Sequence, residues 1–148
     1  MKITLRPYRP EDFDAVTRLW RKSREAAFPE FQRTKGYSFE EDCHYFSETI
    51  LANNHIWVAE IESGVAGFMA IREPYIDQLY IAPALQRMGI GQALLDYAKR
   101  LSPDSLRLHT FQSNRNGRSF YEKNGFRAVK FGLSPPPENE PDVEYRWP

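Results

Sequence analysis

The sequence predicts a single mixed α/β domain that spans residues 1–148 and is built around a largely antiparallel sheet. Three observations predict it. A length of 148 residues is typical of one domain. Hydrophobic residues make up 41% of the chain, which is enough for a packed core. The hydrophobic periodicity changes between helix and strand in the order β-α-α-β-β-β-α-β-α-β-β, which is typical of a sheet combined with helices.

The first part of the chain predicts one strand and two helices. Ile3–Arg6 has the pattern of a short strand. A helix is expected from Pro10, because proline suits a first helical turn and two acidic residues follow it. A second helix is expected from Ser38, which begins the Ser-x-x-Glu spacing of a capping box. The segment between them, Phe28–Tyr37, is expected to be a loop.

The middle of the chain predicts strands. His55–Ile61 and Val65–Ile71 are rich in apolar and β-branched residues and flank a Glu-Ser-Gly turn, which is a hairpin signal. Tyr75–Ala82 is a third expected strand, and Pro83 ends it. Because strands joined by short turns pair antiparallel, we expect these three to do so.

The last part of the chain predicts two helices and three strands. Helical periodicity returns at residues 90–101, and a strand follows at Leu106–Phe111. A second helix is expected over Arg115–Asn124, closed by a glycine. Two strands complete the chain, Phe126–Phe131 and Val143–Trp147. The strand-helix-strand order in this part is compatible with parallel pairing.

Composition and charge exclude several classes of protein. Lys+Arg and Asp+Glu both number 20, and a net charge of zero argues against a general nucleic-acid binder. No run reaches 18 consecutive apolar residues, so no membrane-spanning helix is expected. The polar amino terminus, rich in arginine and proline, is unlike a signal peptide. The lone cysteine, Cys43, excludes an intrachain disulfide and indicates the reducing cytoplasm.

One glycine-bearing turn has the features of an anion site. Gln86–Gln92, with glycine at positions 89 and 91, stands between an expected strand and an expected helix. Backbone N–H groups at a helix start lack intrahelical partners, and the helix dipole adds positive charge, so a diphosphate fits there. The turn is not a dinucleotide G-x-G-x-x-G motif, since Leu94 occupies the third glycine position, and it lacks the Gly-Lys-Ser/Thr of a P-loop.

The same segment resembles the acetyl-CoA pyrophosphate signature of the GNAT acetyltransferases. The shared pattern is Gln-Arg-x-Gly-x-Gly from Gln86, preceded by Leu-Tyr-Ile-x-Pro from Leu79. The resemblance implies a central, mostly antiparallel mixed sheet with helices on both faces, and acetyl-CoA as cosubstrate without a metal. It also implies that the strand backbone pairs with pantetheine and that the amides of the turn hold the pyrophosphate. The cofactor-binding residues implied are Leu79, Tyr80, Ile81, Gln86, Arg87, Met88, Gly89, Ile90, Gly91 and Gln92.

A second segment is similar to the family's other signature. Asn114 is followed seven residues later by Tyr121, within Ser-Phe-Tyr-Glu-Lys-Asn-Gly-Phe. The resemblance implies that Asn114 holds the pantetheine arm and that Tyr121, beside the cofactor, is the general acid. A tyrosine hydroxyl of pKa ~10 stays protonated at neutral pH and can donate to a departing thiolate. Lys123 is one of six basic residues against one acid within 105–130, a local charge that favours the phosphates of coenzyme A.

The general base is left open between three alternatives. His109 lies five residues before Asn114, where some family members carry a catalytic glutamate, and a histidine's ordinary pKa of ~6.5 suits proton transfer at neutral pH. Asp77, on the strand that precedes the glycine turn, is the rival. A water relay with no single base is the third alternative. Cys43 is expected to be a buried helix residue and not a nucleophile, because direct transfer needs no acyl-enzyme.

The function that the resemblance implies is transfer of the acetyl group of acetyl-CoA to a primary amine by direct attack in a ternary complex. The alternative is a non-catalytic module that binds acyl-CoA or a protein partner on the same fold. The acceptor, a small amine or a peptide amine, has no motif in the sequence, and a homodimer is left open. Neither nucleic acid nor a membrane is expected as a partner.

Overall fold

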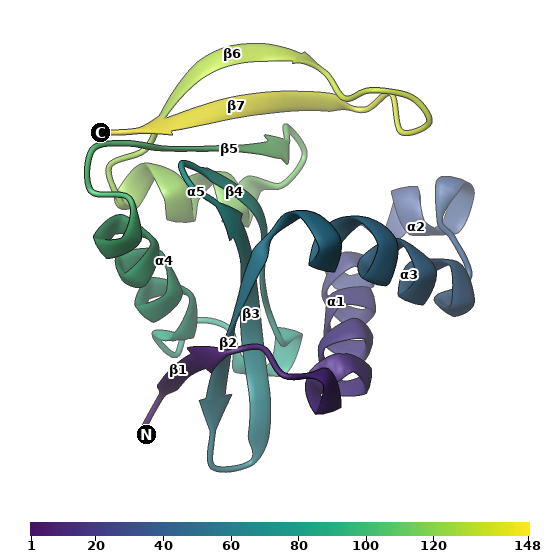
Figure 1. The fold of residues 1–148 in the computed structure, drawn as a ribbon. Coiled ribbons are helices and arrows are strands. Elements are labelled where there is room, and N and C mark those ends of the chain that lie inside the picture. Colours follow the sequence, from purple (N-terminus) through teal and green to yellow (C-terminus); the bar gives the residue numbers. More distant parts are fainter.

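The computed structural model describes residues 1–148, apart from the side chain of Lys35. Within that description, seven strands form one open sheet with helices on both of its faces (Figure 1). The strands are β1 Thr4–Pro7, β2 His55–Ile61, β3 Gly64–Arg72, β4 Tyr75–Ile81, β5 Leu106–Phe111, β6 Arg127–Leu133 and β7 Pro141–Trp147. The helices are α1 Phe13–Ala27, α2 Pro29–Lys35, α3 Phe39–Tyr45, α4 Ile90–Leu101 and α5 Arg115–Lys123, with helical turns η1 Pro10–Asp12, η2 Phe46–Leu51 and η3 Pro83–Leu85.

The sheet is mixed and mostly antiparallel. Its strand order is β1-β2-β3-β4-β5-β7-β6. Strands β4 and β5, which α4 connects, form the parallel pair, and the other five neighbouring pairs are antiparallel. The sheet therefore bends at the β4–β5 pair into two blades, β1–β4 and β5–β7–β6 (Figure 1). The fold class expected from the sequence is confirmed.

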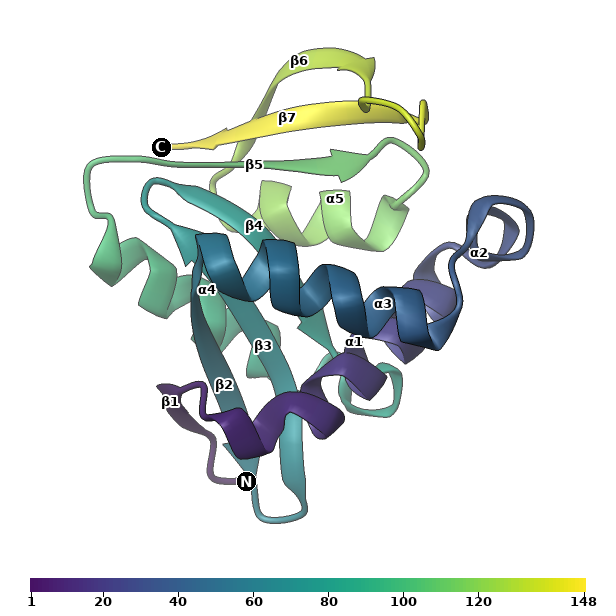
Figure 2. The same cartoon turned by 45° about the vertical axis from the view of Figure 1, so that its right-hand side comes forward.

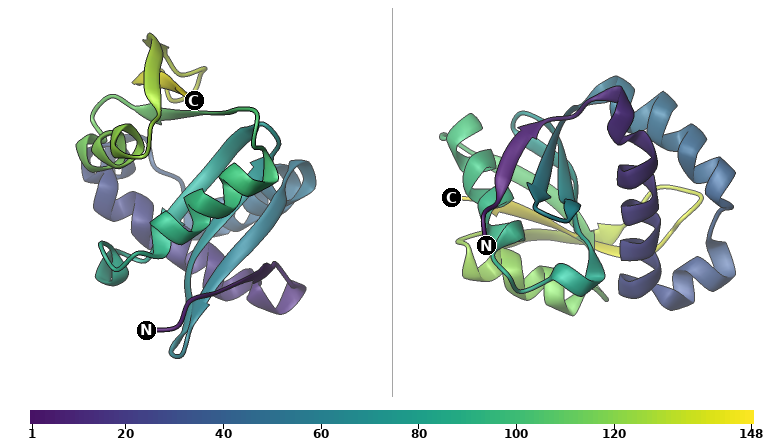
Figure 3. Two further views of the ribbon diagram at one scale, coloured as in Figure 1. Left: turned by 90° about the vertical axis from the view of Figure 1, so that its left-hand side faces the viewer. Right: turned by 90° about the horizontal axis from the view of Figure 1, so that it is seen from below.

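Helices on the two faces of the sheet form two separate apolar cores. On one face, Leu94 and Leu95 of α4 are buried in a cluster with Met69 of β3. On the other face, Trp20 of α1 is buried in a cluster with Phe46 of η2 and Phe68 of β3. The views in Figures 2 and 3 show α1 and α3 on one side of strands β2–β4 and α4 on the other. Because β3 carries buried side chains on both faces, it forms the middle of the domain.

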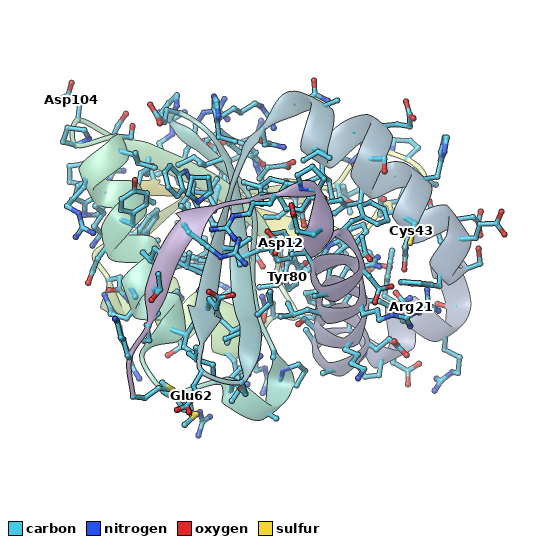
Figure 4. The ribbon with its side chains drawn as sticks, turned by 60° about the horizontal axis from the view of Figure 1, so that its bottom comes forward. Asp12, Arg21, Cys43, Glu62, Tyr80 and Asp104 are labelled. Carbon is cyan, nitrogen blue, oxygen red and sulfur yellow. The ribbon has the colours of Figure 1, made fainter. Side chains whose placement is uncertain are left out.

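The structure corrects three details of the expected elements. The segment Phe28–Tyr37 is not a plain loop, because α2 begins at its proline and continues to Lys35. Strand β6 begins at Arg127 and not at Phe126, since the Phe126 N–H donates to the Tyr121 carbonyl at the end of α5. Cys43 is half-buried and not fully buried, since α3 packs against α1 at the periphery of the domain (Figure 4).

A buried carboxylate joins the first and third helices. Asp42 of α3 is 2% exposed, and its Oδ2 lies 2.8 Å from Arg21 Nη1 and 2.6 Å from Arg24 Nη2, both on α1. The capping box expected at Ser38 is present, because the Glu41 N–H donates to the Ser38 hydroxyl and the Ser38 N–H donates to the Glu41 carboxylate. The Asp42 ion pairs fix α3 against α1, and the helical turn η2 continues from α3.

Candidate active site

The two halves of the sheet separate between β4 and β5. The two strands pair only at Tyr75 with Arg107 and at Ile76 with Leu108. Beyond Ile76, the edge of β4 that faces β5 has no partner strand among the described residues, while the other edge stays paired with β3 as far as Ile81. The backbone groups on the open edge are therefore free to pair with an extended ligand. Figure 1 shows β4 and β5 diverging from this point.

Asp77 is the extra residue of a β-bulge at the start of this opening. On β3, Ala70 pairs with Gln78 and Ile71 with Ile76, so Asp77 faces no partner across the strands. Its carboxylate Oδ2 accepts a hydrogen bond of 2.9 Å from the Asn54 amide and lies 3.6 Å from Arg72 Nη1. The bulge explains how β4 turns away from β5, since a bulge increases local bend and twist. The hydrogen bond from Asn54 thus joins the bulge to the segment before β2.

The three expected cofactor-strand residues lie on β4 beyond the bulge, paired with residues 67–69 of β3. Leu79 and Ile81 pack against the core under α4, and Tyr80 packs on the α1 face against Phe68, with ring centroids 6.2 Å apart. Figure 4 shows Tyr80 beside α1. Burial raises the pKa of Tyr80. The Ser23 hydroxyl of α1 donates to the Ile81 carbonyl at 3.1 Å, which steadies the strand end. The backbone of this segment is thus held in place from both sides of the sheet.

The glycine turn leads directly into the first turn of α4. Gly89 is the N-cap of α4 and has φ +86°, a left-handed conformation that favours glycine. The first intrahelical bond runs from the Ala93 N–H to the Gly89 carbonyl, so the three preceding amides, those of residues 90–92, have no helical partner. The turn residues Gln86, Arg87, Met88 and Gly89 are exposed. An anion can therefore reach these amides from solvent.

Gly91 allows two helices to approach each other. A Cβ added at Gly91 would lie 3.4 Å from Phe120 Cζ of α5 and 3.6 Å from Ile81 Cγ1. These distances are those of ordinary van der Waals contacts, so a methyl group fits at this position but a longer side chain must displace a neighbour. The side-chain Nε2 of Gln92, on α4, donates a hydrogen bond of 2.6 Å to Asn124 Oδ1, at the end of α5. The two helix ends named by the two sequence signatures therefore lie side by side, with Lys123 exposed beside them.

Asn114 is the N-cap of α5. Its Oδ1 accepts from the Gly117 N–H at 3.1 Å, and its Nδ2 donates to Thr110 Oγ1 at 2.9 Å. The side chain thus joins the end of β5 to the start of α5. One amide hydrogen and one carbonyl lone pair remain for a ligand.

Tyr121 is buried in an aromatic cluster between α5 and the sheet. Its side chain is 8% exposed, and its ring centroid lies 5.7 Å from that of Phe126 and 6.1 Å from that of Tyr145. No described residue accepts a hydrogen bond from its hydroxyl or donates one to it. Burial, with a smaller contribution from Tyr80, raises the pKa of Tyr121 well above its usual value. The hydroxyl therefore keeps its proton over the whole neutral range.

A cleft opens on the α1–α3 side of the second half of the sheet. It has a volume of about 550 Å³ and is lined by side chains of β4, β5, β6 and β7, among them Tyr75, His109, Lys130, Asp142 and Glu144. At its end, Phe28 and Phe31 pack against Phe111 of β5, with ring centroids 4.9 and 5.6 Å apart.

His109 is the imidazole of this cleft, and its two ring nitrogens face different partners. Nδ1 lies 2.9 Å from Tyr75 Oη, and Nε2 lies 3.9 Å from Glu144 Oε1, on the residue opposite it in β7. Arg146 holds the pKa of Glu144 below its usual range through a hydrogen bond of 2.9 Å, so this carboxylate is charged. Sequence reasoning missed Tyr75 and Glu144, because the pairing of β4, β5 and β7 brings them to His109 from distant parts of the chain.

Comparison with known proteins identifies the family. The model of the acetyltransferase (GNAT) domain matches residues 52–128. The chain belongs to the GNAT acetyltransferases. The peptidyl-lysine N-acetyltransferase YiaC of Escherichia coli K12 is 29% identical over 127 residues, which cover 84% of each chain. The peptidyl-lysine N-acetyltransferase YjaB of Salmonella typhimurium LT2 is 29% identical over 130 residues, which cover 87% of this chain and 86% of YjaB.

Solved GNAT structures agree in fold. The solution structure of apo YjaB from Escherichia coli gives a TM-score of 0.84 at 24% identity and covers 99% of this chain and 98% of that one. The PaiA N-acetyltransferase of Thermoplasma acidophilum, solved with coenzyme A, gives a TM-score of 0.68 at 23% identity and covers 97% and 98%. The protein is therefore an acetyl-CoA-dependent acyltransferase, as the two sequence signatures implied.

The described residues contain no group of three or more potential metal ligands placed to hold an ion. They also contain no helix with the length and apolarity needed to cross a bilayer.

Proposed function

We propose that this GNAT protein transfers the acetyl group of acetyl-CoA to the side-chain amine of a lysine in a protein or peptide, by direct attack within a ternary complex. The observation that carries the proposal is the opening between β4 and β5. Unpartnered helix-start amides lie beyond one end of it, at the start of α4, and the cleft with His109 lies beside the other. A cofactor lying in this opening would have its acyl end close to the cleft.

We propose that the cofactor follows the residues expected from the sequence. The pyrophosphate lies on the amides at the start of α4, and the open edge of β4 over Leu79–Ile81 pairs with pantetheine. Asn114 holds the pantetheine arm through its remaining amide hydrogen or lone pair, and Lys123 contributes positive charge near the phosphates. The exposure of the turn and the lack of a side-chain cap on α4 support this arrangement.

Tyr121 is proposed as the acid. When the amine attacks, a C–N bond forms at the thioester carbon, the C–S bond breaks and the sulfur leaves as a thiolate. A hydroxyl that is protonated and has no partner among the described residues is suited to donate to that sulfur. Tyr121 meets both conditions, and its aromatic neighbours fix the ring.

His109 is proposed as the proton acceptor of the cleft, in preference to Asp77. The Asp77 carboxylate already accepts from Asn54 and faces Arg72, so its negative charge is used in holding the bulge. The His109 side chain is 39% exposed and lines the cleft, where a proton can also leave to solvent. A water relay past both residues is the remaining alternative, and the pH profiles described below distinguish it.

A lysine of a polypeptide is the proposed acceptor for two reasons. Two relatives named peptidyl-lysine N-acetyltransferases match more than four-fifths of the chain. The cleft also carries the carboxylates of Asp142 and Glu144, which complement an ammonium group.

Turnover of matched acceptors tests this proposal. The kcat/KM of a lysine-containing peptide is compared with that of free lysine, a polyamine and an aminoglycoside, and the same peptide with arginine replacing lysine is the control. The proposal expects the peptide to be the best acceptor and the arginine peptide to be inert. A preference for a small amine by tenfold or more would refute the acceptor class and leave acetyl transfer intact.

We also propose a cytoplasmic location and a single domain over residues 1–148. The lone Cys43 supports the first, and the one continuous sheet supports the second. Cell fractionation tests the location, and a single cooperative unfolding transition tests the domain.

A further inference from the structure

Tyr75 and His109 stand together where β4 and β5 separate. Tyr75 belongs to one of the two residue pairs that hold these strands together, and His109 is the first residue of β5 after them. The hydrogen bond of 2.9 Å between Tyr75 Oη and His109 Nδ1 therefore crosses the strands at the apex of the opening. Both side chains line the cleft that the acceptor amine is proposed to enter.

The direction of this hydrogen bond follows from its surroundings. Burial raises the pKa of Tyr75, so its hydroxyl keeps its proton and can donate it to Nδ1 whenever that nitrogen carries a lone pair. The other ring nitrogen, Nε2, faces the charged Glu144 carboxylate, which favours a proton on Nε2. The lone pair on which neutral His109 can take up a proton is thus Nδ1, and Tyr75 Oη covers it. A direct transfer from the amine to His109 would require this bond to break.

We propose that Tyr75 is the group that contacts the acceptor amine and relays its proton to His109. This inference rests on the proposed function of the same cleft. As the amine nitrogen bonds to the thioester carbon, an N–H bond breaks and its proton moves to Tyr75 Oη. The original Tyr75 proton moves to His109 Nδ1 at the same time, so Tyr75 stays neutral and the positive charge passes from nitrogen to imidazole. The imidazolium then releases its proton to solvent.

Charged groups from five strands surround this pair. Two arginines lie over the Tyr75 ring. The guanidinium carbon of Arg72, on β3, is 4.8 Å from the ring centroid, and that of Arg107, on β5, is 4.7 Å from it. Both lower the pKa of Tyr75, and the nearby Asp77 of β4 raises it, as does Glu144 of β7. The two guanidiniums favour partial negative charge on Oη during the transfer, and Glu144 favours positive charge on His109. In addition, Arg146 hydrogen-bonds Glu144, and Lys130 of β6 lines the same cleft.

Rate against pH separates a relay from a direct base. The kcat/KM of the wild type is measured from pH 5.5 to 9 with a lysine peptide, together with Tyr75→Phe, His109→Gln and the double variant. The control is Tyr97→Phe, which removes a tyrosine hydroxyl on α4 where the ring packs on Trp57. The relay predicts that Tyr75→Phe loses about 10²-fold in kcat/KM and also loses the limb that rises with pH, although His109 is intact. The double variant should be no slower than the slower single one, because the two groups act as a unit.

The outcomes distinguish the two levels of the proposal. A Tyr75→Phe enzyme that keeps the rising limb would overturn the relay and make His109 a direct base, while acetyl transfer stands. A wild type that binds acetyl-CoA but turns over no amine would overturn the proposed function together with the relay. Nitrogen-15 NMR of the imidazole checks the geometry without turnover. At pH 8 the relay requires the proton on Nε2 in the wild type, and a proton on Nδ1 would refute it.

Discussion

Replacing Tyr121 with phenylalanine separates chemistry from packing at the proposed acid. The ring keeps its contacts with Phe120, Phe126 and Tyr145, because the change deletes only the hydroxyl. No described residue hydrogen-bonds to that hydroxyl, so the free energy of unfolding should change by less than about 0.5 kcal/mol. Loss of a principal general acid lowers kcat by about 10²–10⁴-fold. At 1.36 kcal/mol for each tenfold, this is about 2.7–5.4 kcal/mol of activation free energy.

The assay combines three readouts. Release of the CoA thiol under single-turnover conditions gives the chemical step, calorimetric titration gives acetyl-CoA affinity, and thermal unfolding gives stability. The expected result is a large fall in the first with little change in the other two. Because the pKa of Tyr121 is raised, its ionisation should add no falling limb to the rate below pH ~10. A fall in rate of less than about threefold would refute the assignment and leave Tyr121 as a packing residue.

Tyr145→Phe is the matched control from the same aromatic cluster. The Tyr145 hydroxyl donates to Glu122 Oε2 at 2.6 Å and accepts from Arg118 Nε at 3.0 Å. Hydrogen bonds to charged groups contribute about 1.5–3 kcal/mol, and solvent near the exposed Glu122 reduces this. We therefore expect Tyr145→Phe to lower stability by about 1–2 kcal/mol while kcat stays within threefold of the wild type, the reverse of the pattern at Tyr121.

Three other substitutions test separate parts of the structure. Gly91→Glu should weaken acetyl-CoA binding far more than Gly91→Gln in calorimetric titrations, because only glutamate opposes a diphosphate at the helix start; equal affinities would remove the pyrophosphate from this turn. Asp77→Asn should keep the rising pH limb of kcat/KM, since Asn54 and Arg72 already engage the carboxylate; a lost limb would make Asp77 the base. Arg6 holds the pKa of Asp12 below its usual range, so this ion pair stabilises the fold above pH ~4 and loses its effect as pH falls through the lowered pKa. The unfolding free energy of Asp12→Asn should therefore depend less on acid pH than that of the wild type. An unchanged dependence would count against the pair.

The residues that the sequence predicted best are those whose role depends on local geometry. The turn at Gly89 needs a left-handed residue next to a helix start, and Asn114 caps a helix by accepting from the backbone N–H three residues ahead. Both requirements are met within a few positions of the chain. The two signatures and the helices that follow them were therefore readable without a structure.

The cleft was not predictable in the same way. Tyr75, His109 and Glu144 come together only because β5 lies between β4 and β7, an order that no local pattern encodes. The helix α2 was missed because Gly36 and Pro29, which favour turns, bracket a segment too short for a clear helical period. The bulge at Asp77 was also invisible, since a one-residue irregularity leaves the alternation of a short strand almost unchanged.

The stoichiometry and route of acetyl transfer test the central claim most directly. The protein is mixed with acetyl-CoA and a lysine peptide, and free CoA thiol, acetylated peptide and the mass of the intact protein are followed together by mass spectrometry. Direct attack in a ternary complex predicts one acetylated lysine for each CoA released, and no acetyl group on the protein, Cys43 included, when the peptide is omitted. Transfer through an acetylated protein intermediate, or cofactor binding with no acetylated peptide at any pH from 6 to 9, would contradict the account.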